Sequence, residues 1–144
     1  MDTIKFSCVI GSTNITVPLG MEIWLDDEKL LDLDHVYQTH QVEYQMPDND
    51  GDHELRFVLK NKLSDHTEVD SYGNIVSDAT VMVSDIQFDD IDCQYLTVKL
   101  ARYYHDFNGN GEPTIGKFYG EMGCNGTASL KFTTPIYLWL LENM

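Results

Sequence analysis

The stretch that decides the fold is residues 41–59, QVEYQMPDNDGDHELRFVL. Its first half alternates polar residues with the apolar residues Val42, Tyr44 and Met46. Residues 47–52, PDNDGD, then concentrate the residue types that favour turns, and the alternation resumes with Leu55, Phe57 and Leu59. A period of two places every second side chain on the same face of a strand. The stretch therefore predicts two half-buried β-strands separated by a turn.

The same alternation appears on both sides of this stretch. Residues 3–10 place one apolar set on a single face, namely Ile4, Phe6, Cys8 and Ile10. Farther along, residues 21–25 and 30–36 flank the polar segment DDEK at 26–29, which is typical of a hairpin loop. These segments predict a first strand and a β-hairpin.

The second half of the chain contains three more strand-like runs. Residues 79–88, 95–104 and 127–134 are rich in β-branched and aromatic residues, which favour strands. Helical periodicity is almost absent, and the predicted strands recur about every ten residues. We therefore expect an all-β fold, a jelly-roll-like two-sheet antiparallel β-sandwich.

Length and composition indicate one globular domain. The chain has 144 residues, of which 42% are hydrophobic. That size is close to the commonest domain size and is sufficient for one core. No repeat, low-complexity tract or linker interrupts the pattern, so we expect a single domain spanning residues 1–144.

The charge balance restricts the classes of partner. Nine Lys and Arg face 24 Asp and Glu, giving a formal net charge of −15. No basic run is present that would neutralise phosphates, which argues against nucleic acids and anionic membranes. An acidic surface suits a cation, a neutral ligand such as a glycan, or a protein partner with a basic patch. Residues 1–7 lack the basic segment of a signal peptide, so we expect none.

Motifs of catalysis are missing from the sequence. There is no Gly-x-Ser-x-Gly elbow, and the five histidines lack the spacing of zinc ligands. Cys8, Cys93 and Cys124 are too widely spaced for a Cys-x-x-Cys pair, so we expect buried thiols. The sequence therefore favours a protein that binds or assembles over an enzyme.

Acidic loops are the candidates for cation binding. Residues 106–112, DFNGNGE, place oxygen-bearing side chains at alternate positions, namely Asp106, Asn108 and Asn110. Such an alternation opens calcium-binding loops, but Lys117 stands where such a loop ends in Glu. Residues 48–52 have a similar composition and Leu59 at the corresponding end. Each stretch is interpreted either as a metal ligand set or as a solvated turn.

A long polar segment follows Leu59. Residues 60–76 predict a surface loop, and long loops in compact domains often carry function. Its oxygen-bearing side chains, with one beyond it, are hypothesised to converge on one ion: Asn61, Asp65, Asp70 and Asp78.

The last ten residues, PIYLWLLENM at 135–144, are unusually apolar for a chain terminus. They are interpreted either as a final strand or helix turn that closes the sandwich, or as a subunit interface. The second interpretation predicts a homo-oligomer formed through this segment.

Three segments resemble the calcium-dependent xylan-binding carbohydrate-binding modules. They are EIWLDD at 22–27, GDHELRFVLKN at 51–61 and SD at 77–78. The resemblance implies a non-catalytic module that recognises a glycan with Ca²⁺ as cofactor. It implies Asp65, Asp70 and Asp78 as metal ligands, and it places ligand contacts at Asn61, Asp65, Asp70 and Tyr72. Lys62 follows Asn61 where the family tends to place an acid.

Other segments resemble small structural proteins of marine tailed bacteriophages. They are LKNK at 59–62, residues 70–78 and residues 118–126. This resemblance implies an alternative function, a virion structural or assembly protein without a small-ligand site. The two hypotheses differ in what they place on the surface: a carboxylate-lined pocket near Asn61 and Asp106 in the first, and an apolar patch over 136–141 in the second.

Overall fold

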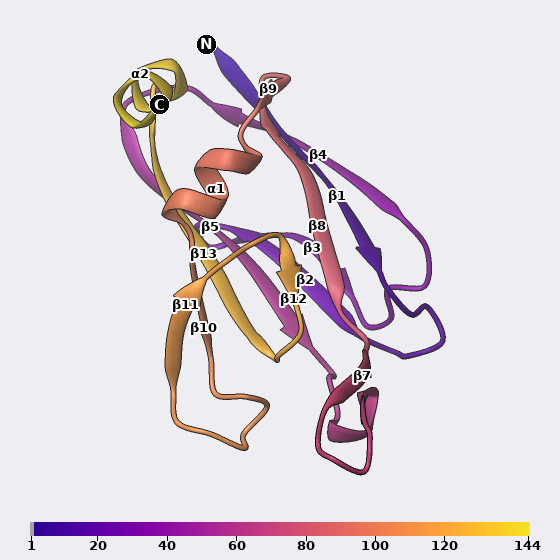
Figure 1. Ribbon diagram of the computed structural model, residues 1–144. Coiled ribbons are helices and arrows are strands. Elements are labelled where there is room, and N and C mark those ends of the chain that lie inside the picture. Colours follow the sequence, from indigo (N-terminus) through magenta and orange to yellow (C-terminus); the bar gives the residue numbers. More distant parts are fainter. Residues whose placement is uncertain (1) are drawn as a thin grey trace.

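The computed structural model describes residues 2–144, which form two antiparallel sheets packed face to face (Figure 1). The strands of the first sheet, in spatial order, are β12 (Glu121–Met122), β8 (Val81–Phe88), β1 (Thr3–Ser12) and β4 (His40–Pro47), with β9 (Ile91–Asp92) paired to β8. Those of the second are β11 (Thr114–Lys117), β10 (Arg102–His105), β13 (Gly126–Thr134), β5 (Gly51–Lys60), β2 (Gly20–Leu25) and β3 (Glu28–Leu33). The predicted all-β sandwich is confirmed.

The core lies between the two sheets and follows the alternation of the sequence. The apolar face of β1 is fully buried, with exposed fractions of at most 1% for Ile4, Phe6, Cys8 and Ile10. Phe88 on β8 joins the layers, because its ring lies 5.6 Å from that of Phe6 and 5.0 Å from that of Phe132 on β13. Burying each such side chain contributes about 1.5–3 kcal/mol to folding.

The deciding stretch crosses between the sheets. Its first strand, β4, pairs with β1, whereas its second strand, β5, pairs with β2 and β13. The turn at 48–50 therefore carries the chain from one layer to the other. The predicted loop at 26–29 is a true hairpin: β2 pairs with β3, and Asp26 and Asp27 lie between them.

The expected strand over 95–104 is wrong in its first part. Residues Gln94–Leu100 form helix α1, and only Arg102–His105 form strand β10. The helix connects β9 of one sheet to β10 of the other (Figure 1). It buries Leu96 and Thr97, and the Gln94 side chain bonds the backbone of β8 at Val83 and Ile86. Packing across the sheet edge thus overrides the local preference for a strand.

The segment after Leu59 is more ordered than a loop. It contains a short 3₁₀-helix, η1 (Ser64–His66), followed by the hairpin of β6 (Thr67–Val69) and β7 (Ile75–Asp78). The hairpin projects from one end of the sandwich, the same end at which β10 turns into β11 (Figure 1).

The chain closes with helix α2 (Ile136–Asn143), which packs on β13 through Ile136, Trp139 and Leu140. Its other apolar side chains are exposed: Tyr137, Leu138, Leu141 and, after the helix, Met144. A subunit interface through them stays a prediction. No helix within residues 2–144 has the length and apolar character needed to cross a bilayer.

Candidate functional site

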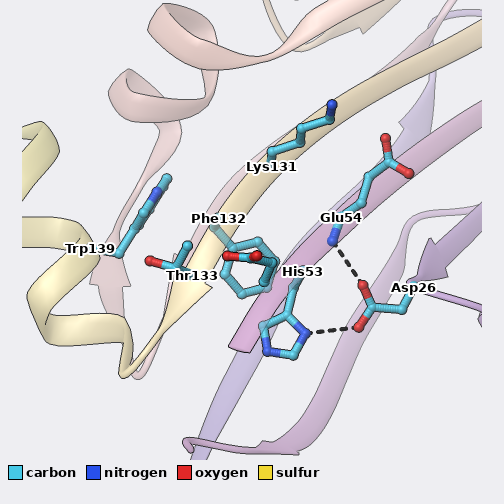
Figure 2. Close-up of a pocket in the computed structure, with 8 residues that line it drawn as sticks. Asp26, His53, Glu54, Lys131, Phe132, Thr133 and Trp139 are labelled. Atoms are coloured by element: carbon cyan, nitrogen blue, oxygen red, sulfur yellow. Dashed lines mark hydrogen bonds and ion pairs between the residues drawn. The ribbon is translucent and has the colours of Figure 1, made fainter. Parts of the chain in front are cut away.

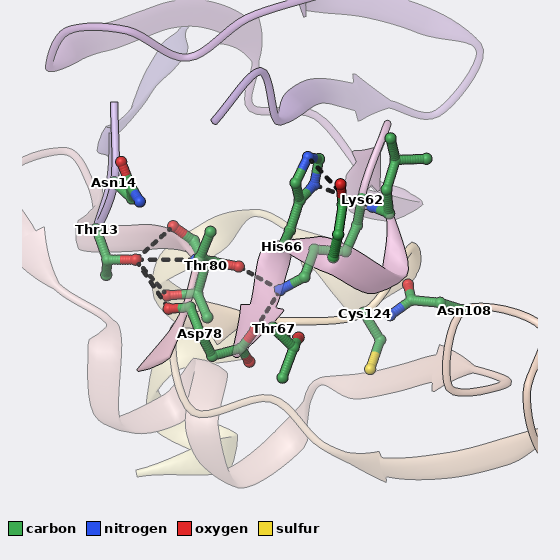
Figure 3. Close-up of polar contacts among 12 residues, drawn as sticks. Thr13, Asn14, Lys62, His66, Thr67, Asp78, Thr80, Asn108 and Cys124 are labelled. Carbon is green, nitrogen blue, oxygen red and sulfur yellow. Dashed lines mark hydrogen bonds and ion pairs between the residues drawn. The ribbon is translucent and has the colours of Figure 1, made fainter. Parts of the chain in front are cut away.

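A buried lysine organises the loop end of the sandwich (Figure 3). The side chain of Lys62 has no exposed surface, and its ammonium donates to Asp78 Oδ1 at 2.5 Å and to the carbonyl of Ala79. Thr67 donates to the same carboxylate oxygen at 2.6 Å. A buried ammonium requires such partners, because an unpaired charge is costly in the interior.

Asn125 forms hydrogen bonds that connect the loop at 106–112 to the backbone of Lys62, next to the Lys62–Asp78 pair. Its Oδ1 accepts the backbone N–H of Lys62 at 2.9 Å, and its Nδ2 donates to the carbonyl of Lys62 at 2.8 Å. Its own N–H donates to Asn108 Oδ1 at 2.7 Å. The two predicted loops, at 60–76 and 106–112, are therefore brought together at one end, although no sequence pattern singled out Asn125.

The first predicted ligand set is spread along this end. Asp70 lies at the tip of the β6–β7 hairpin, where its Oδ1 accepts the N–H groups of Tyr72 and Asn74, both at 2.9 Å. These backbone hydrogen bonds, that of Asn74 most strongly, lower the pKa of Asp70 below its ordinary value. Asp65 is exposed, and Asn61 Nδ2 donates to the carbonyl of Asp34 at 3.2 Å. Ligand contacts by these residues stay a prediction.

The second predicted set forms a hydrogen-bonded turn. Asp106 Oδ1 accepts the N–H of Gly109 at 2.8 Å, while Asn108 is engaged by Asn125. Asn110 is exposed, and its backbone N–H donates to the carbonyl of Phe107 at 3.2 Å. These contacts match the alternative interpretation of a solvated turn.

The surroundings of Asp78 do not fit a calcium ion, whereas metal binding by the other predicted ligands stays a prediction. Nowhere in 2–144 do three or more His, Cys, Asp or Glu side chains gather in a way that could hold a metal. The carboxylate of Asp78 already faces the ammonium of Lys62, which supplies the positive charge at that position. Calcium needs several converging oxygen ligands, and a lysine among them opposes it.

Beneath α2, a cleft of about 530 Å³ opens along β5 and β13 (Figure 2). Its lining combines apolar rings with charged and polar side chains: Asp26, Asp52, His53, Glu54, Lys131, Phe132, Thr133 and Trp139. Figure 2 shows the imidazole of His53 directed toward the carboxylate of Asp26. Sequence reasoning missed this cleft, because its residues come from four segments without a shared motif, namely the β2–β3 turn, β5, β13 and α2.

His53 is held on both sides. Its Nδ1 lies 2.8 Å from Asp26 Oδ2 and its Nε2 lies 3.0 Å from Thr134 Oγ1. Asp26 Oδ1 accepts the N–H of Glu54 at 2.9 Å. Partial desolvation raises the pKa of Asp26, but the hydrogen bonds from His53 and Glu54 outweigh it and leave the pKa below its ordinary value.

Two further clefts continue the first one toward the loop end. A cleft of about 310 Å³ shares Lys131 and Trp139 with it and adds Leu100, Arg102, Tyr104, Ser129 and Asn143. The next, of about 480 Å³, shares Tyr104 and adds His105, Asp106, Pro113, Thr114, Ile115, Asn125 and Gly126. We call these three clefts together the β13 groove.

The β13 groove follows the outer side of the second sheet. Along β13 it runs from Thr133 to Gly126, seven residue steps, or about 23 Å at about 3.3 Å per strand residue. Tyr104 and Ile115 are register partners on β10 and β11, and they are 44% and 66% exposed. They give the loop-end cleft an apolar surface beside the polar groups of Asp106 and Asn125.

Other aromatic residues take structural roles. Phe118 and Tyr103 are buried, and Tyr103 Oη bonds both the carbonyl and the N–H of Cys124. Trp24 is flanked by the cations of Lys29 and Arg56, each 5.3 Å from the ring centroid. Trp24, Phe118 and Tyr103 do not line the β13 groove.

Of the comparisons with known proteins, the one with solved structures bears on the fold. Neither protein-family models nor curated protein sequences match the chain. A solved structure of vCBM60 matches with a TM-score of 0.55 at 12% identity, and its description states that circular permutation links two families of calcium-dependent carbohydrate-binding modules. The match covers 88% of this chain and 89% of that one. A structure of vCBM60 with galactobiose matches with a TM-score of 0.44 at 12% identity, covering 90% and 97%.

The match with a TM-score of 0.55 bears on the two resemblances seen in the sequence. It supports a fold of the carbohydrate-binding-module type, and it gives no support to xylan specificity or to a bacteriophage assembly protein. At 12% identity the similarity concerns the fold alone. The chain thus has a β-sandwich fold similar to that of a calcium-dependent carbohydrate-binding module.

Proposed function

We propose that this chain is a non-catalytic module that binds a polysaccharide along the β13 groove. The observation that carries the proposal is the continuity of three clefts through the shared residues Tyr104, Lys131 and Trp139. A long open groove accommodates a polymer, whereas a small metabolite favours a single enclosed cavity. Sugar rings present both apolar faces and hydroxyl groups, which suit the apolar surface at Tyr104 and the polar side chains beside it.

The surroundings of two groove carboxylates, Asp26 and Glu54, favour binding over hydrolysis at these positions. A glycosidase requires a carboxylic acid whose pKa is raised so that it can donate a proton. The pKa of Asp26 is instead lowered. Glu54 Oε2 accepts the hydroxyl of Ser129 at 2.6 Å, and Arg56 lies 3.7 Å from its other oxygen. Both side chains are therefore committed to contacts within the chain.

The proposal includes no calcium ion. The structurally similar vCBM60 is described in connection with calcium-dependent modules, but here Lys62 provides the charge that balances Asp78. The ammonium is buried and bonded within the chain, so binding would not respond to chelation of metal.

The β6–β7 hairpin extends the proposed surface beyond the groove. Its tip exposes 89% of Tyr72 beside Asp70, and Asn61 and Asp65 are exposed near its base. Asn125 lines the loop-end cleft and bonds Lys62, which precedes the hairpin. A polymer leaving the loop-end cleft would meet these four side chains.

The test is a binding screen of neutral and acidic polysaccharides by isothermal titration calorimetry, with Tyr104→Ala as the groove variant. Removal of an aromatic contact costs about 1–1.5 kcal/mol, so we expect roughly a tenfold weaker affinity for the bound glycan. Tyr119→Ala is the matched control, because Tyr119 is 70% exposed and does not line the groove. Absence of binding to every polysaccharide, or equal losses in both variants, would overturn the proposal.

A further inference from the structure

The nine basic side chains divide into two groups. Five of them form ion pairs with Asp or Glu, namely Lys5, Lys29, Arg56, Lys60 and Lys62. Within residues 2–144, the other four have no carboxylate at ion-pair distance, namely Lys99, Arg102, Lys117 and Lys131. With 24 acidic residues in the chain, four unpaired cations require an explanation.

The four unpaired cations are neighbours in the fold. Arg102 on β10 is the register partner of Lys117 on β11 and of Ser129 on β13. Lys131 lies two residues beyond Ser129 on the same side of β13, and it lines the middle cleft together with Arg102. Lys99 Nζ donates to the carbonyl of Asn143, another residue of that cleft, at 3.3 Å. The middle of the β13 groove is therefore a basic strip on a strongly acidic molecule.

The guanidinium of Arg102 is held in place with N–H groups available for an anion. Its Nη1 donates to the carbonyls of Lys99, Leu100 and Ala101 at 3.4, 3.3 and 3.0 Å, which fixes the guanidinium at the end of α1. In the described part of the chain its Nε and Nη2 make no hydrogen bond, and the residue is exposed. A planar guanidinium with one free edge is suited to a carboxylate, which it binds through two parallel hydrogen bonds.

We propose that the middle cleft recognises carboxylate groups, so that the glycan bound in the β13 groove is an acidic polysaccharide. This inference rests on the proposed function, because it names the class of polymer that the same groove takes. Arg102 would bind the carboxylate, and Lys131 and Lys117 would add attraction from the two neighbouring strands. None of the described residues that line the middle cleft is acidic. In the adjoining cleft, Glu54 is engaged by Ser129 and Arg56, and Asp26 by His53. Elsewhere the acidic surface repels such a polymer, which restricts its approach to this strip.

The test compares one polymer backbone with and without charge. Oligomers of polygalacturonate and their methyl esters are titrated by calorimetry at physiological ionic strength, where charges more than about 8 Å apart are largely screened. We expect the acid to bind at least about tenfold more tightly than the ester. Lys131→Gln and Arg102→Gln should each lose more affinity for the acid than for the ester, by roughly five- to tenfold.

Two controls keep the test decisive. Lys5→Gln removes one charge on the other sheet and should leave both affinities unchanged. Arg102 also bonds the end of α1. Lys131→Gln separates recognition from folding, because the Lys131 side chain makes no hydrogen bond with the residues that the structure describes. Equal affinity for acid and ester overturns the inference and leaves the proposed function intact, whereas failure of all polysaccharides to bind overturns both. A dimer in sedimentation that Lys131→Gln dissociates would assign the strip to a second copy of the chain and overturn the inference.

Discussion

The ammonium of Lys62 and the carboxylate of Asp78 lie 2.5 Å apart at the loop end of the sandwich, with the lysine side chain completely buried. The pair joins the end of β5 to the start of β8, because Lys62 follows β5 and Asp78 ends β7 immediately before β8. Through Asn125 it also fixes the loop after β10. The buried ammonium of Lys62 thus stabilises the region for which the sequence predicted a metal ion.

Replacement of this cation should destabilise the fold. Lys62→Met leaves Asp78 without its ammonium in a partly buried position, and breaking such a pair from one side costs about 2–4 kcal/mol. Urea unfolding at neutral pH would measure the difference. The double variant Lys62→Met with Asp78→Asn should recover part of the loss, because no unpaired charge remains. A single-variant loss below about 0.5 kcal/mol would contradict the structural role of the pair.

Calcium should leave the thermal stability of the protein unchanged. An ion bound only by the folded state raises its stability by about 2.7 kcal/mol when its concentration is a hundred times its dissociation constant. The predicted ligands Asp65, Asp70 and Asp78 are not gathered around one point, so we expect the same Tm with excess calcium as with EDTA. A Tm several degrees higher in calcium would show that the loop end rearranges to bind the ion.

Lowering the pH should remove the stabilisation that the ionised Asp26 side chain gives to the folded state. Its pKa is lowered in the folded state, so it stabilises the fold above its unfolded pKa of about 3.9, and this contribution is lost as the pH falls through the lower folded pKa. Because the side chain is 46% exposed, we expect Asp26→Asn to cost only about 1 kcal/mol at pH 6.

Chemical unfolding across a pH series tests the Asp26 prediction. The difference between the native protein and Asp26→Asn should shrink as the pH falls below about 4 and vanish near pH 2. Asp27→Asn is the matched control, because Asp27 is exposed and forms no ion pair with the described residues. A difference that is independent of pH would mean that the carboxylate charge plays no part.

The thiols should be unreactive in the native protein. Burial raises the pKa of Cys8 to about 12 and raises the pKa values of Cys93 and Cys124 above their ordinary range. Only thiolates react readily with disulfide reagents. We expect almost no release of thionitrobenzoate from the folded chain at pH 8 and three equivalents in denaturant. Rapid reaction of one thiol in the native state would point to Cys124, which is only half-buried.

Local alternation in the sequence was sufficient to predict the sandwich. Apolar residues alternate with other residues along β1, along residues 55–59 of β5 and along residues 128–132 of β13, and each such set lies in the core. A strand with one apolar face must bury it against another layer, so the class of fold follows from the pattern. The alternation did not predict helix α1. The sequence of this helix has a strand-like composition, and its conformation depends on packing against β8.

The site depended on tertiary structure. The sequence indicated acidic loops near Asn61 and Asp106. It could not show that the Lys62 ammonium would form an ion pair with Asp78, or that hydrogen bonds of Asn125 would connect the two loops. It could not show the β13 groove either, because Arg102, Lys131 and His53 become neighbours of one groove only after β5, β10 and β13 pair. Sequence period determines which face of a strand is buried, whereas strand order determines which exposed side chains meet, and strand order is set by contacts between residues far apart in the chain.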